Sequence, residues 1–195
     1  MRRIFAGFVV GFFLCAAAIG LTSTAQATDI LVIEVAGQAN GIVEIELLDD
    51  LAPDHVAQVK ALAEAGAYDG VVFHRVIDGF MAQTGDVEYG KLAGSDLRRA
   101  GMGGSSLPDL KAEFSDEAFV RGIVGMARSQ SPDSANSQFF IMFDAAPFLN
   151  GQYTVLGRVI SGMDVVDVIK KGSQSANGSV GAPADYMKSV KVIAR

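Results

Sequence analysis

The chain has 195 residues and a formal net charge of −6, and half of its residues are hydrophobic. Its 22 glycines and 5 prolines exclude a collagen-like chain, and its hydrophobic content excludes a wholly disordered one. This length is typical of one domain, or of two small ones.

The first 27 residues have the pattern of a secretory signal peptide. A basic start precedes an uncharged apolar run over residues 4–21, and a polar stretch then ends in the A-x-A pattern Ala25-Gln26-Ala27. We expect cleavage after Ala27, which leaves a mature chain that starts at Thr28. The signal pattern, together with a mature chain that lacks cysteine, favours a bacterial periplasm.

Alternatives to a cleaved signal peptide stay open. The run over residues 4–21 is long enough to remain as a membrane anchor. Cys15 would suit a lipoprotein, but Leu14 precedes it where a small residue is expected, so we discount that interpretation. The Arg2-Arg3 pair would suit a twin-arginine signal, although so apolar a run is more typical of ordinary secretion. Once cleaved, the protein should have no stable association with a membrane.

The mature chain of 168 residues is acidic and free of cysteine. It keeps 14 basic and 22 acidic residues, a net charge of −8, which argues against a nucleic-acid-binding protein. Loss of Cys15 removes the only cysteine, so neither a disulfide nor a thiol nucleophile is possible. The hydrophobic core alone must hold the fold, and the chain is long enough for that.

The mature chain begins with a predicted β-hairpin and a helix. Ile30–Val35 and Ile42–Leu48 are rich in β-branched residues and flank a turn that contains glycine and asparagine. Residues 50–65 predict a helix, with Pro53 in its first turn and Gly66 at its end.

Short strands dominate the remainder. Residues 85–118 form a long loop rich in glycine, serine and charge, and long ordered loops are often functional. A second helix is expected near Gly162–Lys171, with Val166 and Ile169 facing inward. A flexible linker is expected over Ser173–Pro183. The predicted strands are Val71–Val76, Phe80–Thr84, Gly122–Ala127, Gln138–Phe143, Tyr153–Ile160 and Met187–Ile193.

About eight strands and two helices predict a single domain over residues 28–195. Because the strands mostly follow one another, the order favours a mainly β fold, either an antiparallel sheet or a closed barrel. The two helices would cap the ends of such a barrel. Residues 177–179 match a glycosylation sequon, which we attribute to chance.

Several common catalytic sites find little support. His55 and His74 are the only histidines, so a zinc site would need carboxylates at an unproven spacing. There is no G-x-S-x-G motif, and the glycine run at 101–104 lacks the ending of a phosphate-binding loop. We interpret Asp86 and Glu88 as loop acids rather than a catalytic pair, and expect neither a metal nor a cofactor.

Two stretches place unusual polar side chains within strand patterns. One is FHRVIDGFMAQTGD at residues 73–86; the other combines GMARS at 125–129 with SQFFI at 137–141. Arg75 stands among apolar residues, where burying it is costly unless it is paired or lies at a site. Without further context, an exposed strand face explains it equally well, since alternate residues face outward.

These motifs and their spacing closely resemble the cyclophilin family of peptidyl-prolyl cis–trans isomerases, in particular its bacterial periplasmic branch. The resemblance extends from the strand at Ile42 to the strand at Val190. It implies a closed eight-stranded antiparallel barrel capped by two α-helices. It also implies an isomerase of X–Pro bonds, without a cofactor, that assists the folding of exported proteins. The partners would be proline-containing, unfolded or flexible polypeptides, and we expect a monomer.

The resemblance assigns roles to individual residues. Arg75 matches the catalytic arginine, which would hydrogen-bond the transition state, and Gln83 matches a glutamine that supports it. His74 matches a residue of the site wall that transfers no proton. The remaining matches would bind substrate, in the apolar pocket for the proline ring or in the groove beside it: Phe80, Met81, Ala127, Arg128, Gln138, Phe140, Phe148, Leu149 and Tyr153.

Three of these residues depart from many eukaryotic members. Phe148 stands where they carry tryptophan, Tyr153 where they carry histidine, and Arg128 where they carry asparagine. Bacterial members tolerate the first two, so activity should survive, whereas the missing indole N–H puts cyclosporin binding in doubt. A chaperone-like peptide holder is the alternative function, and the complete set of site residues argues against it as the sole role.

Overall fold

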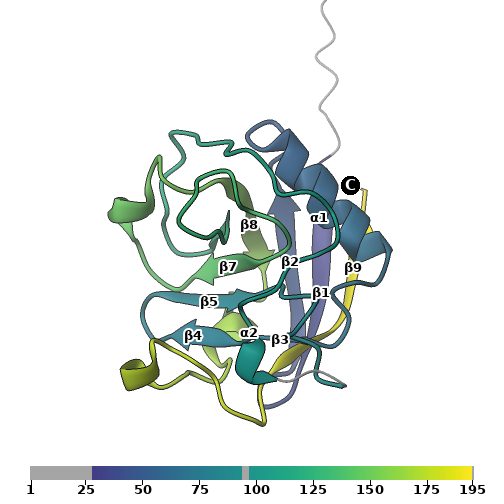
Figure 1. Ribbon diagram of the computed structural model, residues 1–195, viewed down its shortest axis with the longest axis vertical. Coiled ribbons are helices and arrows are strands. Elements are labelled where there is room, and N and C mark those ends of the chain that lie inside the picture. Colours follow the sequence, from purple (N-terminus) through teal and green to yellow (C-terminus); the bar gives the residue numbers. More distant parts are fainter. Residues whose placement is uncertain (1–27, 94–96, 195) are drawn as a thin grey trace, which may run out of the picture.

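The structure is a computed structural model that describes residues 28–93 and 97–194 (Figure 1). The predicted signal peptide over residues 1–27 lies outside this part, so its cleavage stays a prediction. Among the described residues, no helix has both the length and the apolar character needed to span a bilayer.

One nine-stranded antiparallel sheet curls around the hydrophobic core (Figure 1). Its spatial order is β3-β9-β1-β2-β8-β6-β7-β5-β4, so strands distant in sequence pair with one another. The strands are β1 (Ile30–Ala36), β2 (Gly41–Leu47), β3 (Val71–Val72), β4 (Arg75–Ile77), β5 (Met81–Thr84), β6 (Ile123–Met126), β7 (Phe139–Met142), β8 (Val155–Ser161) and β9 (Tyr186–Ile193).

The expected closed eight-stranded barrel is wrong: the sheet is a curled half-barrel of nine strands. The expected strand Val71–Val76 divides at Phe73 and His74, which gives β3 and β4 at opposite edges of the sheet. Phe73 N–H donates to the carbonyl of Asp185, just before β9 begins. Beyond this contact the chain pairs with residues 178–180 instead of β9: Val180 N–H donates to the carbonyl of His74, and Val76 N–H donates to the carbonyl of Gly178.

Helix α1 (Pro53–Glu64) confirms the predicted helix. Pro53 occupies its first turn, where the missing N–H costs nothing, and Gly66 follows its end with φ of 66°. The helix packs over β9 with its apolar side chains buried. The N–H groups of Asp54 and His55 donate to the carboxylate of Glu113, which ties the helix N-terminus to the long loop.

Helix α2 (Met163–Asp167) is shorter than expected. Val166 and Ile169 are buried as predicted, but the helix ends before Ile169. The Lys170 N–H donates to Asp185 Oδ2 at 2.7 Å instead of continuing the helical pattern. The carboxylate of Asp185 therefore holds the chain just beyond the end of this helix.

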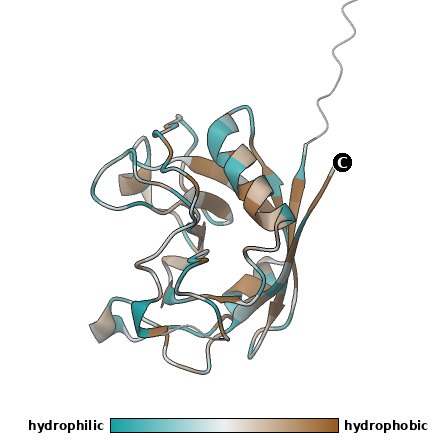
Figure 2. Ribbon diagram, turned by 45° about the vertical axis from the view of Figure 1, so that its right-hand side comes forward, coloured by the Kyte–Doolittle hydropathy of each residue, from teal (hydrophilic) through white to brown (hydrophobic). Residues whose placement is uncertain are grey.

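The core has two parts, and the hydrophobic residues follow the strands (Figure 2). The larger cluster lies between the sheet and the helices. The smaller cluster gathers around Met81, Phe119, Phe140 and Leu149, and it continues into partly buried residues such as Tyr153. The smaller cluster thus reaches the surface through its partly buried members.

Two long connections are ordered by hydrogen bonds. In the loop after β5, which contains the 3₁₀ turn Leu97–Arg99, the buried carboxylate of Asp86 accepts from the N–H groups of Gly101 and Gly103 at 2.7 and 3.0 Å. Residues 173–183, expected as a flexible linker, contain the 3₁₀ turn Gln174–Ala176 and lie along β4.

Candidate active site

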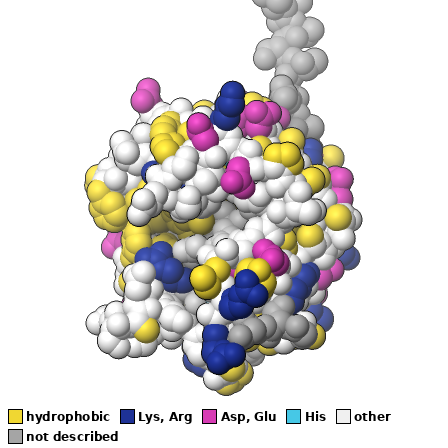
Figure 3. Space-filling model, viewed as in Figure 1, with side chains coloured by type: hydrophobic (Ala, Val, Ile, Leu, Met, Phe, Trp, Pro, Cys, Tyr) yellow, Lys and Arg dark blue, Asp and Glu magenta, His cyan; other side chains and the backbone are white. Residues whose placement is uncertain are grey.

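An apolar hollow of about 210 Å³ opens where the smaller cluster reaches the surface. Figure 3 shows hydrophobic side chains gathered in the depression on this face. The hollow lies between strands β4 to β7 and the segment that holds the 3₁₀ turn Pro147–Leu149. It is lined by Arg75, Phe80, Met81, Gln83, Ala127, Arg128, Phe140, Phe148, Leu149 and Tyr153.

Aromatic rings form the floor of the apolar hollow. Phe140 is 6% exposed and stacks on Phe119 with ring centroids 5.9 Å apart. The ring of Tyr153 meets Phe140 edge-on, at 5.8 Å and 83°. This packing needs a glycine at 125, because a Cβ there would lie 2.5 Å from Phe140 Cζ and 2.6 Å from Phe119 Cε1.

Exposed aromatic side chains stand at the mouth of the hollow. Phe148 is 71% exposed, and its ring centroid lies 5.7 Å from that of the partly buried Phe80. Covering an exposed apolar ring with a ligand lowers the free energy, so these two side chains are suited to contact a bound apolar group.

Arg75 is held at the edge of the hollow by three oxygen acceptors. It pairs with Gln83 across strands β4 and β5, and its Nη1 donates to Gln83 Oε1 at 3.2 Å. Its Nε donates to the Asn177 carbonyl and its Nη2 to Asn177 Oδ1, both at 3.0 Å. Burial lowers the pKa of Arg75, but a guanidinium remains charged in proteins.

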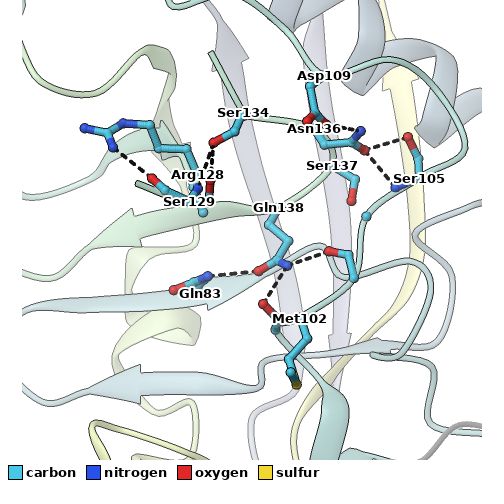
Figure 4. Close-up of a pocket in the computed structure, with 14 residues that line it drawn as sticks. Gln83, Met102, Ser105, Asp109, Arg128, Ser129, Ser134, Asn136, Ser137 and Gln138 are labelled. Atoms are coloured by element: carbon cyan, nitrogen blue, oxygen red, sulfur yellow. Dashed lines mark hydrogen bonds between the residues drawn. The ribbon is translucent and has the colours of Figure 1, made fainter. Parts of the chain in front are cut away.

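A line of amides continues from Arg75 (Figure 4). Gln83 Nε2 donates to Gln138 Oε1 at 2.9 Å, and Gln138 Nε2 donates to the carbonyls of Gly101 and Gly103 at 3.1 and 2.7 Å. An arginine only donates and a carbonyl only accepts. Both glutamine amides are therefore fixed in one orientation, with their oxygens towards Arg75.

A second, polar hollow of about 380 Å³ adjoins the first (Figure 4). The two share Gln83, Ala127 and Arg128. Loops form most of the polar hollow, from residues 101–105 on one side and 129–137 on the other. Its other lining residues are Gly101, Met102, Gly103, Gly104, Ser105, Asp109, Ser129, Ser134, Asn136, Ser137 and Gln138.

Arg128, which lines both hollows, is held by contacts with neighbouring residues. Arg128 Nη1 donates to the Ser129 carbonyl and Nη2 to the Gln152 carbonyl, both at 2.9 Å. Its Cζ lies 4.4 Å from the ring centroid of Tyr153, a cation–π distance. The neighbouring Ala127 N–H donates to the carbonyl of Gln138. Arg128 thus fixes the wall between the two hollows.

Comparison with known proteins decides the family. Residues 30–192 match the model of the family described as "Cyclophilin type peptidyl-prolyl cis-trans isomerase/CLD". The chain belongs to this cyclophilin family. A "Probable peptidyl-prolyl cis-trans isomerase" of Brucella suis is 61% identical over 174 residues, which are 89% of each chain. "Peptidyl-prolyl cis-trans isomerase-like 3" of Gallus gallus is 38% identical over 135 residues, 67% of this chain and 77% of the relative.

Solved cyclophilins share the fold. A cyclophilin-type isomerase of Cryptosporidium parvum, whose structure was determined in the presence of the dipeptide Ala-Pro, has a TM-score of 0.70 and 25% identity, covering 85% of this chain and 99% of that one. AquaCyp293 of Hirschia baltica has a TM-score of 0.67 at 24% identity, over 85% and 79% of the chains. The predicted family and enzyme class are confirmed, and the periplasmic branch stays a prediction.

Ten of the twelve predicted site residues line the apolar hollow of this cyclophilin, and Gln138 lines the polar one. His74 lines neither. It is 8% exposed, and it lies against Gly101, where a Cβ would be 2.9 Å from its Cδ2. Burial lowers the pKa of His74 to about 4, so its ring is neutral at physiological pH.

Two residues of the site escaped the sequence analysis. Phe119 supports the floor of the apolar hollow, and Asn177 holds Arg75. In the sequence, Asn177 stands out only as part of a sequon, in a segment expected to be flexible. Among the described residues, no group of three or more His, Cys, Asp or Glu side chains is placed to hold a metal ion.

Proposed function

We propose that this isomerase binds the proline ring in the apolar hollow and that Arg75 stabilises the twisted X–Pro bond. The observation that carries the proposal is a fixed guanidinium beside an aromatic floor. Rotation about X–Pro must break amide resonance, against a barrier of about 18–20 kcal/mol. Uncatalysed exchange takes tens to hundreds of seconds, which leaves ample scope for catalysis.

Catalysis would follow from differential binding. As the bond twists, the proline nitrogen loses double-bond character and becomes a better hydrogen-bond acceptor. An N–H of Arg75 directed at that nitrogen binds the twisted state more strongly than either planar state, which is the condition for a faster reaction. The apolar surroundings exclude water and strengthen this interaction.

The reaction requires no acid, base or nucleophile, because no proton or covalent bond is exchanged. The side chains at the site agree with this chemistry. Arg75 stays protonated, and burial keeps His74 neutral. The rate should accordingly show no titration of a site group between about pH 6 and 9.

We further propose that the substrates are exported, proline-containing polypeptides in a bacterial periplasm and that the enzyme acts there as a monomer. The signal-like residues 1–27 and the acidic, cysteine-free remainder support this location. Fractionation of the native host, with the mass of the exported form, tests it. A mature N-terminus at Thr28 supports the proposal, while a full-length membrane-bound form would overturn it.

The catalytic proposal is tested by replacing Arg75. In Arg75→Ala the rate of X–Pro exchange in a short peptide should fall about 10²–10³-fold, the scale of losing one transition-state donor. Arg75→Lys keeps a positive charge but loses the planar fork, so most of the rate should be lost as well. Exchange spectroscopy on a proline tetrapeptide measures both.

The matched control is Arg158→Ala. Arg158 is a partly exposed arginine on β8 that pairs with Glu46 at 3.2 Å, away from the hollow, and its loss should leave the rate within about twofold. Full activity of a folded Arg75→Ala variant would refute the assigned role. Retained suppression of aggregation by this variant would instead indicate a peptide-holding function.

A further inference from the structure

The guanidinium of Arg75 is held from two sides, by a strand and by a turn. Strand β5 supplies Gln83, whose position follows from the ladder with β4. The turn supplies Asn177, 102 positions further along the chain, which accepts through both its backbone carbonyl and its side-chain oxygen. Two acceptors from one residue engage adjacent N–H groups and so fix the plane of the guanidinium.

Asn177 can make both contacts because of its backbone conformation. Its φ is 51°, and it is the one residue other than glycine with positive φ among those the structure describes. Asparagine tolerates this left-handed region better than most residues do. An asparagine here therefore serves two purposes, as a turn former and as a bidentate acceptor.

Hydrogen bonds join the turn that contains Asn177 to β4, the strand of Arg75. Val76 N–H donates to the carbonyl of Gly178 at 2.8 Å, and Gly178 N–H donates to the carbonyl of Ser173 at 2.8 Å. A Cβ at Gly178, where φ is 78°, would lie 2.4 Å from Ile77 Cγ1. Only a glycine lets the turn lie this close to β4. Gly178 is therefore needed for the close approach that brings Asn177 to Arg75.

These contacts leave part of the arginine free to act. A guanidinium has five N–H donors, and oxygen atoms engage three of them: one on Nε, one on Nη1 and one on Nη2. Two N–H groups are left, one on each Nη, and the one on Nη1 reaches only the weakly accepting Sδ of Met81, at 3.9 Å. Met81 and Arg75 both line the apolar hollow, so these weakly engaged donors are the ones that a substrate bound there can use.

We propose that Asn177 is a positioning residue of this isomerase, which orients the free N–H donors of Arg75 before substrate binds. The proposal rests on the proposed role of Arg75. A free arginine side chain samples many rotamers, and confining it in advance removes that entropic cost from the transition state. Asn177 would therefore act on the rate constant kcat rather than on peptide affinity.

Asn177→Gly isolates the side chain, since glycine keeps the left-handed backbone and the carbonyl that accepts from Nε. We expect kcat to fall about tenfold, because a small misplacement of a catalytic group is costly. KM and the dissociation constant of a proline peptide should stay within about twofold. Gln174→Ala, in the same exposed turn, is the control and should match the wild type.

A double-mutant cycle separates positioning from a general structural role. If Asn177 acts only through Arg75, Asn177→Gly should have no further effect on the rate in the Arg75→Ala background. An equal loss in both backgrounds would overturn the proposal. The thermal unfolding of each variant verifies that the fold is intact.

The same set of variants distinguishes the two proposals. A slow Arg75→Ala with a fully active Asn177→Gly overturns the positioning role and leaves the proposed function in place. A fully active Arg75→Ala overturns both. A slow Arg75→Ala, a slow Asn177→Gly with unchanged affinity, and a double variant no slower than Arg75→Ala support both.

Discussion

The apolar and polar hollows share a wall but are built in different ways. In the apolar hollow, the sheet register sets the key positions: Gln83 pairs with Arg75 on one side and with Phe140 on the other, and Phe140 pairs with Gly125. In the polar hollow, loop backbone and short side chains line most of the space. The apolar hollow is therefore fixed by paired strands, and the polar hollow by individual side chains that hydrogen-bond to the loops.

Two polar side chains, those of Asn136 and Asp86, hold the loops of the polar hollow. Asn136 accepts from the N–H and the hydroxyl of Ser105 and donates to the Leu107 carbonyl and to Asp109 Oδ1. The buried carboxylate of Asp86 holds the loop at Gly101 by accepting from the N–H of that residue. The apolar hollow should therefore be sensitive to side-chain volume, whereas the polar one should be sensitive to the loss of single hydrogen bonds.

Of the changes that compare the two hollows, one added methyl group beneath the apolar hollow should lower the rate most. In Gly125→Ala, the new Cβ would overlap the rings of Phe140 and Phe119, so the floor must move. We expect the isomerisation rate to fall about tenfold or more and the free energy of unfolding to fall by about 1–3 kcal/mol. Peptide exchange rates and denaturant titration measure the two quantities.

The same change in the polar hollow gives the contrast. In Gly104→Ala the Cβ would lie 3.1 Å from Asn136 Cγ, a contact that a small side-chain shift relieves. The rate on a short peptide should fall by no more than about threefold, in keeping with a typical surface substitution. Equal losses in the two variants would contradict the distinction between the hollows.

His74, beneath the polar loop at Gly101, should make stability depend on pH. Burial lowers its pKa to about 4, from an ordinary value of 6.5. As pH falls from 6.5 to 4, the unfolded chain binds a proton that the folded protein resists, so the free energy of unfolding decreases. The loss should reach about 3 kcal/mol and then level off below pH 4, where both states are protonated.

A variant that cannot titrate isolates this contribution. The carboxylates titrate in the same pH range, so the wild type must be compared with His74→Gln under identical conditions. The difference in unfolding free energy between the two proteins should change by about 3 kcal/mol between pH 6.5 and 4 and be constant above pH 7. Parallel pH profiles would show that His74 is not held neutral by the fold.

The sequence motifs predicted the site on the strands well, because the pairing of two strands determines which of their residues are adjacent. Once the stretches at 73–86 and 137–141 are placed on paired strands, Arg75, Gln83 and Phe140 come together without further information. The strand count was wrong because the partner of residues 71–76 changes along their length, from β9 to the irregular segment 178–180. Such a change of partner depends on contacts between distant parts of the chain.

What the sequence did not predict lies in loops. Asn177 carries the ordinary signal of a turn, and nothing local indicates that its oxygens meet an arginine 102 positions earlier. Phe119 follows a long loop without a periodic pattern, so its stacking on Phe140 could not be inferred. Asp86 was interpreted as a loop acid, and the structure shows it buried, with four N–H groups bound to its carboxylate.

The smallest effect on the rate with a short peptide is expected from replacing Asn136, whose side chain holds the loops of the polar hollow. Asn136→Ala deletes four hydrogen bonds that are partly exposed to solvent, so the free energy of unfolding should fall by only about 1–2 kcal/mol. A tetrapeptide short enough to fill only the apolar hollow should be isomerised at close to the wild-type rate. Longer peptides that extend into the polar hollow should lose affinity, because the loops that line it are no longer held. Isothermal titration with peptides of increasing length measures this difference. An equal loss of rate for the shortest substrate would show that the loops around Asn136 also support the floor on which the proline ring rests.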